Sequence, residues 1–237
     1  MTTTLESPTF NPPTDFPETE SPRHWRLRTY VLLGVGALAA VAGGMVVADH
    51  AMATTQHETR VFQETITALD LDASSGSIRV VGADQSNVTV DMTVHSGLRS
   101  PSHTETVQNG RLRVHSDCSF TFTDCFVDYV IKVPAGVAVT ARGDGGNMDL
   151  VGMRGDVDVS INGGDVHVSF ASAPDLIRAR ANGGRIVVAV PNDGQGYHVN
   201  AKANGGSTRV DIRTDPASKH VIDAKVNGGE FTVQYSK

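Results

Sequence analysis

Acidic residues that could divide acid and base catalysis between them lie close together in this 237-residue sequence. Asp156 and Asp158 are two positions apart in an apolar alternation, so a β-strand would place both carboxylates on one face, about 6.5 to 7 Å apart. Carboxylates at that separation can hydrolyse glycosidic bonds, which makes a polysaccharide-active enzyme the alternative function. Outward positions of a soluble sheet must be polar in any case, so we expect no catalytic residue and no enzyme. The acidic residues are Asp144, Asp149, Asp156, Asp158 and Asp165.

Metal and cofactor sites are not expected. The stretch GDGGNMDLV, residues 143–151, partly matches a calcium-binding loop of stacked β-coils. Later units carry Val168, Val188 or Val210 where the loop needs Asp, so neighbouring loops cannot share an ion. No phosphate loop or nucleotide-binding fingerprint is present, and with a net charge of −6 we expect no nucleic-acid partner.

Cations recur at one position of the repeat, two residues before each glycine corner. If successive units stack, these side chains form an outward column with neighbours about 4.8 Å apart. Like charges in line either extend into solvent over the sheet or bind an anion, such as anionic wall polymer or lipid headgroups. The candidate ligand-binding residues are Arg142, Arg180, Lys202 and Lys225, with Ser160 in the same column.

The elements that would position this column are defined by a repeated Asn-Gly-Gly corner. Apolar residues alternate before and after each corner, which predicts two strands joined by a tight turn. Glycine supplies the positive φ that the turn needs, and Asn tolerates the left-handed region. From Asp144 onward the corners are 18, 20, 22 and 23 residues apart, a spacing typical of a stacked repeat. The repeated asparagines are Asn162, Asn182, Asn204 and Asn227.

The preferred fold is all-β, a β-solenoid-like stack of two-strand units. In such a stack the four asparagines form an amide ladder, which rewards the same residue at every corner. A column of small residues (Ala141, Ala179, Ala201, Ala224) suits a thin interior between two sheets. An antiparallel β-meander or sandwich is the alternative, because Asn-Gly also forms hairpin turns. Longer strands before residue 135 are expected to cap the stack.

The two cysteines, Cys118 and Cys125, are expected to form a short-loop disulfide in an oxidising compartment. A zinc pair is the weaker interpretation, because Cys-x₆-Cys is not a usual ligand spacing.

The N-terminal part predicts a membrane anchor. Residues 1–28 are rich in Pro, Thr and Glu and predict a disordered cytoplasmic tail. Residues 29–48 carry no charge and are long enough for a transmembrane helix, with arginines on the preceding, cytoplasmic side. A signal peptide cleaved after Ala53 is the alternative. We expect a linker over 49–60 and an extracytoplasmic β-strand-repeat domain over 61–237.

The stretch VDYVIKVPAGVAVTARGDGGNMDLVGMRGDVDVSINGGDVHVSF and the Asn-Gly-Gly units that follow it resemble bacterial surface domains known as putative adhesins. The resemblance covers roughly residues 60–237 and brings no catalytic residues. It implies an extracytoplasmic, membrane-tethered β-solenoid linked to the cell envelope. We expect this domain to be non-enzymatic and to bind wall components or protein partners.

Overall fold

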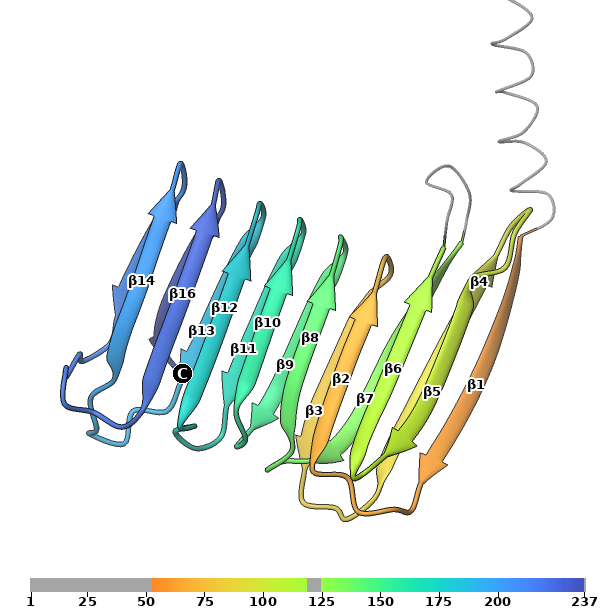
Figure 1. Ribbon diagram of the computed structural model, residues 1–237, viewed down its shortest axis with the longest axis horizontal. Coiled ribbons are helices and arrows are strands. Elements are labelled where there is room, and N and C mark those ends of the chain that lie inside the picture. The colour runs from red at the N-terminus through yellow and green to blue at the C-terminus, as the bar shows by residue number, and fades with distance from the viewer. Residues whose placement is uncertain (1–52, 119–124, 237) are drawn as a thin grey trace, which may run out of the picture. The chain divides into compact units, whose positions relative to one another are not determined.

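The computed structural model describes residues 53–118 and 125–236, which form two β-sheets and no helix (Figure 1). Within these residues no helix is long and apolar enough to cross a membrane. The tail expected over 1–28 and the transmembrane helix expected over 29–48 lie outside the described residues.

Each strand of the described chain belongs to one of two sheets. Sheet A has nine strands in the order β1 (Thr54–Phe62), β4 (Val88–Ser96), β7 (Phe126–Pro134), β3 (Ile78–Ala83), β9 (Asn147–Met153), β11 (Asp165–Phe170), β13 (Arg185–Val190), β17 (Glu230–Tyr235), β15 (Ser207–Asp211). Sheet B has eight strands in the order β14 (His198–Asn204), β16 (Val221–Asn227), β12 (Leu176–Ala181), β10 (Val157–Ile161), β8 (Ala138–Gly143), β2 (Ala68–Ala73), β6 (Arg111–Asp117), β5 (Ser102–Gln108).

The repeat units place their two strands in different sheets. In each unit from β8/β9 to β16/β17, the strand before the glycine corner lies in sheet B and the strand after it in sheet A. Neighbouring units pair through parallel strands in register, so that Val159 lies beside Ala141 on one side and Ala179 on the other. A meander would make consecutive strands antiparallel neighbours, so this alternative is wrong for these units.

The units do not follow one another in chain order. Strand β16 lies between β12 and β14, and β17 lies between β13 and β15, so the last unit along the chain is inserted before the preceding one (Figure 1). The β14/β15 unit is therefore the end of both sheets.

The corners need glycine because successive units approach closely there. Gly184 has a φ of 78°, and a Cβ at this position would lie 1.9 Å from the carbonyl oxygen of Gly164. In the last two units the positive φ falls on the first glycine of the pair instead, at Gly205 and Gly228. Both arrangements let the backbone turn between sheets without a side chain in the gap.

The core lies between the sheets and consists of the inward residues of the alternation. Val159, Ala179, Val188 and Val233 have no exposed surface, and Ala224 is 1% exposed. Both sheets thus contribute fully buried aliphatic residues, with alanines recurring in sheet B, as expected for a thin interior.

The N-terminal end is less regular, as the sequence predicts for a cap. Strands β1, β4 and β7 pair antiparallel in sheet A, and β5 and β6 pair antiparallel in sheet B. Strand β1 begins at Thr54, within the segment 49–60 for which we expected a linker. This strand is exposed on both faces and has no apolar alternation, so its sequence gave no strand signal.

Candidate functional site

The four candidate cations occupy one column on the outer face of sheet B. Parallel pairing sets Arg142 beside Ser160, Ser160 beside Arg180, Arg180 beside Lys225 and Lys225 beside Lys202. We call Arg142, Arg180, Lys225 and Lys202 the cationic column. Because of the inserted unit, Lys225 separates Arg180 from Lys202, whereas the chain order would put Lys202 in the middle.

The cations of the column differ in their ion pairs. Arg180 Nη1 lies 2.9 Å from Asp158 Oδ1, on the neighbouring strand β10. Arg142, Lys202 and Lys225 are exposed and make no ion pair with any residue of 53–118 or 125–236. The two lysines are adjacent, so this end of the column carries two neighbouring positive charges that no carboxylate neutralises.

A hollow of about 220 Å³ lies where the column meets the corners. Its walls include the side chains of Arg180 and Lys225 and the amides of Asn182 and Asn227. Cationic groups and amide donors at one place can bind an anionic group such as a phosphate or carboxylate.

The corner asparagines form a continuous side-chain ladder beside this hollow. Each Nδ2 donates to the Oδ1 of the next unit: Asn204 to Asn227 at 3.1 Å, Asn227 to Asn182 at 3.2 Å, and Asn182 to Asn162 at 2.8 Å. The ladder ends at a carboxylate, where Asn162 donates to Asp144 Oδ1 at 2.6 Å. The ladder fixes the spacing of the units and therefore that of the column.

Most of the carboxylates considered for catalysis have a structural partner. Asp156 Oδ1 accepts a hydrogen bond from the backbone of Leu176 at 2.9 Å, and Asp158 pairs with Arg180. Asp149 lies 3.3 Å from both Arg79 and His167, on the outer face of sheet A. Asp165 is also on sheet A, so the structure separates it from Asp158, which lies on β10 of sheet B.

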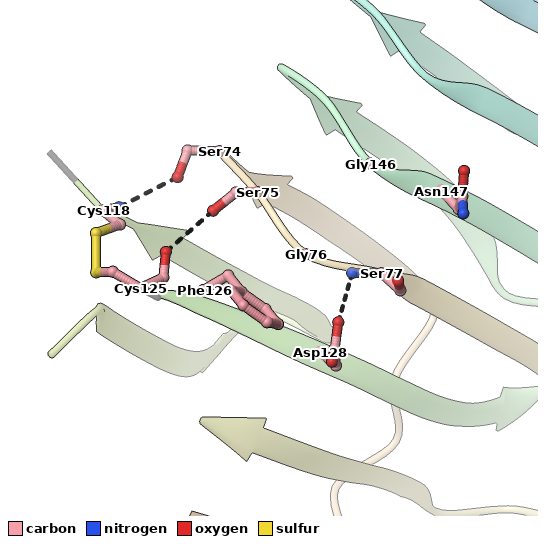
Figure 2. A pocket seen from close by; sticks show the side chains of 10 residues that line it. All are labelled: Ser74, Ser75, Gly76, Ser77, Cys118, Cys125, Phe126, Asp128, Gly146 and Asn147. Carbon is pink, nitrogen blue, oxygen red and sulfur yellow. Dashed lines mark hydrogen bonds between the residues drawn. A yellow bond between two sulfur atoms is a disulfide. The ribbon is translucent and has the colours of Figure 1, made fainter. Parts of the chain in front are cut away.

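Cys118 and Cys125 are bonded as a disulfide with a Cα–Cα distance of 6.0 Å. The bond lies at one edge of an open hollow of about 470 Å³ between the β2–β3 and β8–β9 corners (Figure 2). Ser74 and Ser75 hydrogen-bond to the backbone of the two cysteines and hold this edge in place.

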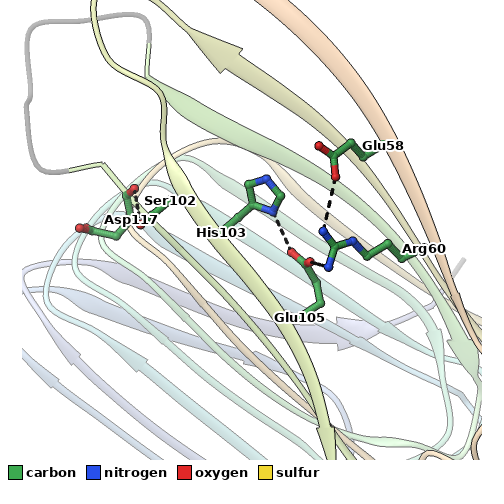
Figure 3. Close-up of polar contacts among 6 residues, drawn as sticks. All are labelled: Glu58, Arg60, Ser102, His103, Glu105 and Asp117. Carbon is green, nitrogen blue, oxygen red and sulfur yellow. Dashed lines mark hydrogen bonds and ion pairs between the residues drawn. The ribbon is translucent and has the colours of Figure 1, made fainter.

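A buried polar network at the N-terminal end was missed by the sequence analysis. Glu105 points inward from β5, its side chain has no exposed surface, and its Oε2 lies 2.8 Å from Arg60 Nη1 of β1 (Figure 3). His103 lies 3.2 Å from the other carboxylate oxygen, and Glu58 lies 3.6 Å from Arg60. The only signal in the sequence is a glutamate at an inward position of a strand that is otherwise weakly apolar.

Two buried tyrosines also lie in the core. Burial raises the pKa of Tyr129 and of Tyr197 to about 12. The Tyr197 hydroxyl has no hydrogen-bond partner within the described residues, and the Tyr129 hydroxyl lies beside the Ser116 side chain and close to Glu105 and Arg60. Neither tyrosine lies in the cationic column.

Comparison with known proteins gives matches among solved structures alone. No protein-family model matches the chain, and no curated protein matches it. A putative cell adhesion protein from Clostridium sporogenes is 11% identical, covers 77% of this chain and 100% of its own, and has a TM-score of 0.59. A putative adhesin from Bacteroides fragilis is 13% identical over 76% of this chain and 97% of its own, with a TM-score of 0.37.

A putative lipid binding protein from Parabacteroides distasonis is 12% identical over 75% of this chain and 96% of its own, with a TM-score of 0.27. Of these three proteins, the Clostridium protein has a TM-score above 0.5, and at 11% identity its similarity to this chain is one of fold. The expected resemblance to bacterial putative adhesins is confirmed as a resemblance of fold.

Proposed function

We propose that this chain is a membrane-anchored protein of the bacterial cell envelope whose extracytoplasmic domain binds an anionic wall polymer and is not an enzyme. The observation that carries the proposal is the cationic column, in which Lys202, Lys225 and Arg142 have no ion pair among the described residues. Unpaired cations in line are unusual in a chain of net charge −6, because like charges on neighbouring strands repel.

The direction of the column favours a linear ligand. The column runs across the strands, along the direction in which units stack, with neighbours about 4.8 Å apart. A polymer with regularly spaced negative charges can contact Lys202, Lys225 and Arg180 in succession, and each contact relieves the repulsion between the cations. A compact anion would reach only one or two of them.

The regular spacing follows from the architecture that we propose for the domain, a two-sheet β-solenoid. In-register parallel pairing of β8, β10, β12, β16 and β14 supports this, as does the amide ladder. Such a domain holds the backbone of the column rigid, so the spacing of the cations is set before a ligand binds.

Two observations support the envelope location. Residues 29–48 form an uncharged apolar segment with arginines on its N-terminal side, as expected for an anchor that keeps the N-terminus in the cytoplasm. The Clostridium protein of the same fold is described as a putative cell adhesion protein, and adhesion requires no catalytic residue.

Retention of the full-length chain on purified anionic cell-wall material, in detergent and at low ionic strength, tests the proposal. Lys202→Glu with Lys225→Glu should lower retention by at least about tenfold, because both unpaired cations are replaced by repelling charges. Lys132→Glu with Lys219→Glu is the matched control, since it changes the net charge equally at exposed positions outside the column. Added salt should weaken binding steeply.

Equal losses in both double variants would mean that net charge, and not the column, governs binding, and would overturn the proposal. Vesicles containing phosphatidylglycerol form a second arm of the experiment. Retention on these vesicles, without retention on wall material, would identify the ligand as the membrane surface and not a wall polymer.

A further inference from the structure

A second hollow, of about 470 Å³, has no residue of the cationic column among its lining residues (Figure 2). This volume is within the range of small-molecule sites. Three separate parts of the chain form it: the β2–β3 corner, the disulfide with the start of β7, and the β8–β9 corner. Strand pairing of β2 with β8, of β3 with β9 and of β3 with β7 brings these segments side by side.

Two glycines give this hollow a floor without side chains. Gly76 has a φ of 100°, and a Cβ there would lie 2.2 Å from the carbonyl oxygen of Val127. Gly146 has a φ of 87°, and its Cβ would lie 2.1 Å from the carbonyl oxygen of Gly76. As at the later corners, neither position can carry a side chain, because a Cβ would meet the backbone of the neighbouring segment, so the hollow is bounded here by main chain alone.

The walls of the hollow are held in place by local bonds. The disulfide closes one side, and the Ser75 hydroxyl donates to the Cys125 carbonyl at 3.5 Å. The backbone N–H of Ser77 donates to Asp128 Oδ1 at 2.7 Å. The ring of Phe126 stacks on His95 with centroids 4.3 Å apart, which fixes an aromatic surface beside the floor. A site preorganised in this way loses little entropy when a ligand binds.

The polar groups of the hollow suit a neutral ligand with hydroxyl and amide groups. Asn147, Ser77 and Asp128 lie in one row, at the starts of β9 and β3 and on β7 (Figure 2). The Asn147 side chain is exposed and makes no hydrogen bond with the described residues. The row offers an amide, a hydroxyl and a carboxylate, and no Lys or Arg lines the hollow. An anionic group would meet the Asp128 carboxylate without a compensating cation.

From this geometry we infer that the hollow between Gly76, Gly146 and Phe126 binds an N-acetylated sugar ring of an uncharged wall glycan. The apolar face of the ring and its acetyl methyl group pack on Phe126, and the hydroxyl and amide groups bond to Asn147, Ser77 and Asp128. This inference rests on the proposed location in the envelope. It adds to the polyanion-binding column a second site with different chemistry on the same domain.

The probe is a β-1,4-linked tetramer of N-acetylglucosamine, titrated into the full-length chain in detergent by calorimetry. Asn147→Ala and Phe126→Ala should each weaken binding by about five- to tenfold, because each removes one specific contact. Asn200→Ala, another exposed asparagine that makes no hydrogen bond with the described residues, is the matched control and should bind the tetramer as the parent does. A circular dichroism spectrum like that of the parent shows that each variant is folded.

The two sites are distinguished by crossing the variants with the probes. Lys202→Glu with Lys225→Glu should bind the sugar tetramer normally, and Asn147→Ala should be retained normally on anionic wall material. Absence of tetramer binding at millimolar concentration, or equal binding by the parent and both hollow variants, would overturn the inference and leave the polyanion proposal untouched. Displacement of the tetramer by inorganic polyphosphate would also overturn it, because the hollow would then prefer anions.

Discussion

At the scale of single residues, the corner asparagines do not contribute equally. Asn182 lies inside the ladder, where it donates to Asn162 and accepts from Asn227. Asn204 is the first member and has one ladder bond, which it donates to Asn227. All these amides are exposed, so water replaces a lost partner and each bond stabilises the fold by about 1 kcal/mol or less.

The first prediction follows from this difference. Asn182→Ala should lower the free energy of unfolding by about 1 to 2 kcal/mol and Asn204→Ala by about half as much, because two bonds are lost in one case and one in the other. Urea denaturation of the two variants measures the difference. Equal losses would mean that the ladder bonds do not stabilise the fold and that the corner backbone alone does.

The second prediction concerns pH. Burial raises the pKa of Tyr129 and Tyr197 from 10.0 to about 12. Between these values the unfolded chain has lost the two protons that the folded domain still holds, so the free energy of unfolding should fall as the pH rises from 10 to 12. Below pH 10 both states keep the protons, and the two groups then contribute no pH dependence.

Tyr129→Phe should make that fall in stability less steep and lower stability at pH 7 by about 1 kcal/mol or less, because the removed hydroxyl contacts the Ser116 side chain. Denaturant melts at pH 7, 10 and 11 measure both effects. An unchanged slope above pH 10 would show that the Tyr129 hydroxyl is not protected from water.

At the scale of elements, the two ends of the stack are built differently. At the N-terminal end, the inward Glu105 of β5 and Arg60 of β1 join the edges of the two sheets by an ion pair. Inward charges at a sheet edge discourage further strands from adding to it. At the other end no such pair is present on β14 or β15, and the inward Val210 is 37% exposed. Protection against the addition of further strands is therefore concentrated at the N-terminal end of the stack.

The third prediction tests the N-terminal ion pair. Arg60→Ala should destabilise the domain by about 2 kcal/mol, because it leaves the buried Glu105 carboxylate without its cation. Glu105→Leu in the same variant should recover most of that loss, since no buried charge then remains. Glu58→Ala is the control and should cost less than about 0.5 kcal/mol, because its pair with Arg60 is exposed and longer. Failure of Glu105→Leu to recover stability would contradict this account.

The alternation around Asn-Gly-Gly made the elements of the repeat predictable. The apolar residues that alternate before and after each corner lie on strands and point inward. Arg180 and Lys225 stand between these apolar positions, so the alternation also predicts that they point outward. Strand β1 was not predictable, because its residues are polar on both faces and its strand form depends on pairing with β4. The inward Glu105 was hidden for a similar reason, since its partner Arg60 lies far away in the sequence.

At the scale of the whole domain, the order of the units could not be read from the pattern. The inward residues of β14 and β16 alternate in the same way, so either strand fits beside β12. The long connection between β15 and β16 allows the chain to place β16 between β14 and β12. There, Tyr197 bridges to Thr214, and His220 bonds to the Pro174 carbonyl at 2.8 Å. Tertiary packing of these connections, and not the repeat itself, selects the order.

The fourth prediction tests this order directly, because the order decides which cations of the column are neighbours. Lys202 lies beside Lys225 in register, so their Cα atoms should be about 4.8 Å apart, within the range that a disulfide can bridge. Arg180 and Lys202 are separated by β16, which places them about 9.6 Å apart and out of reach. Under mild oxidation Lys202→Cys with Lys225→Cys should form a new intramolecular disulfide, and Arg180→Cys with Lys202→Cys should keep both thiols free. Thiol counting by alkylation and mass measurement separates the two results, with Cys118 and Cys125 remaining bonded in both variants. The opposite outcome, a disulfide in the second variant alone, would mean that the units stack in chain order and that Lys202 occupies the middle of the column.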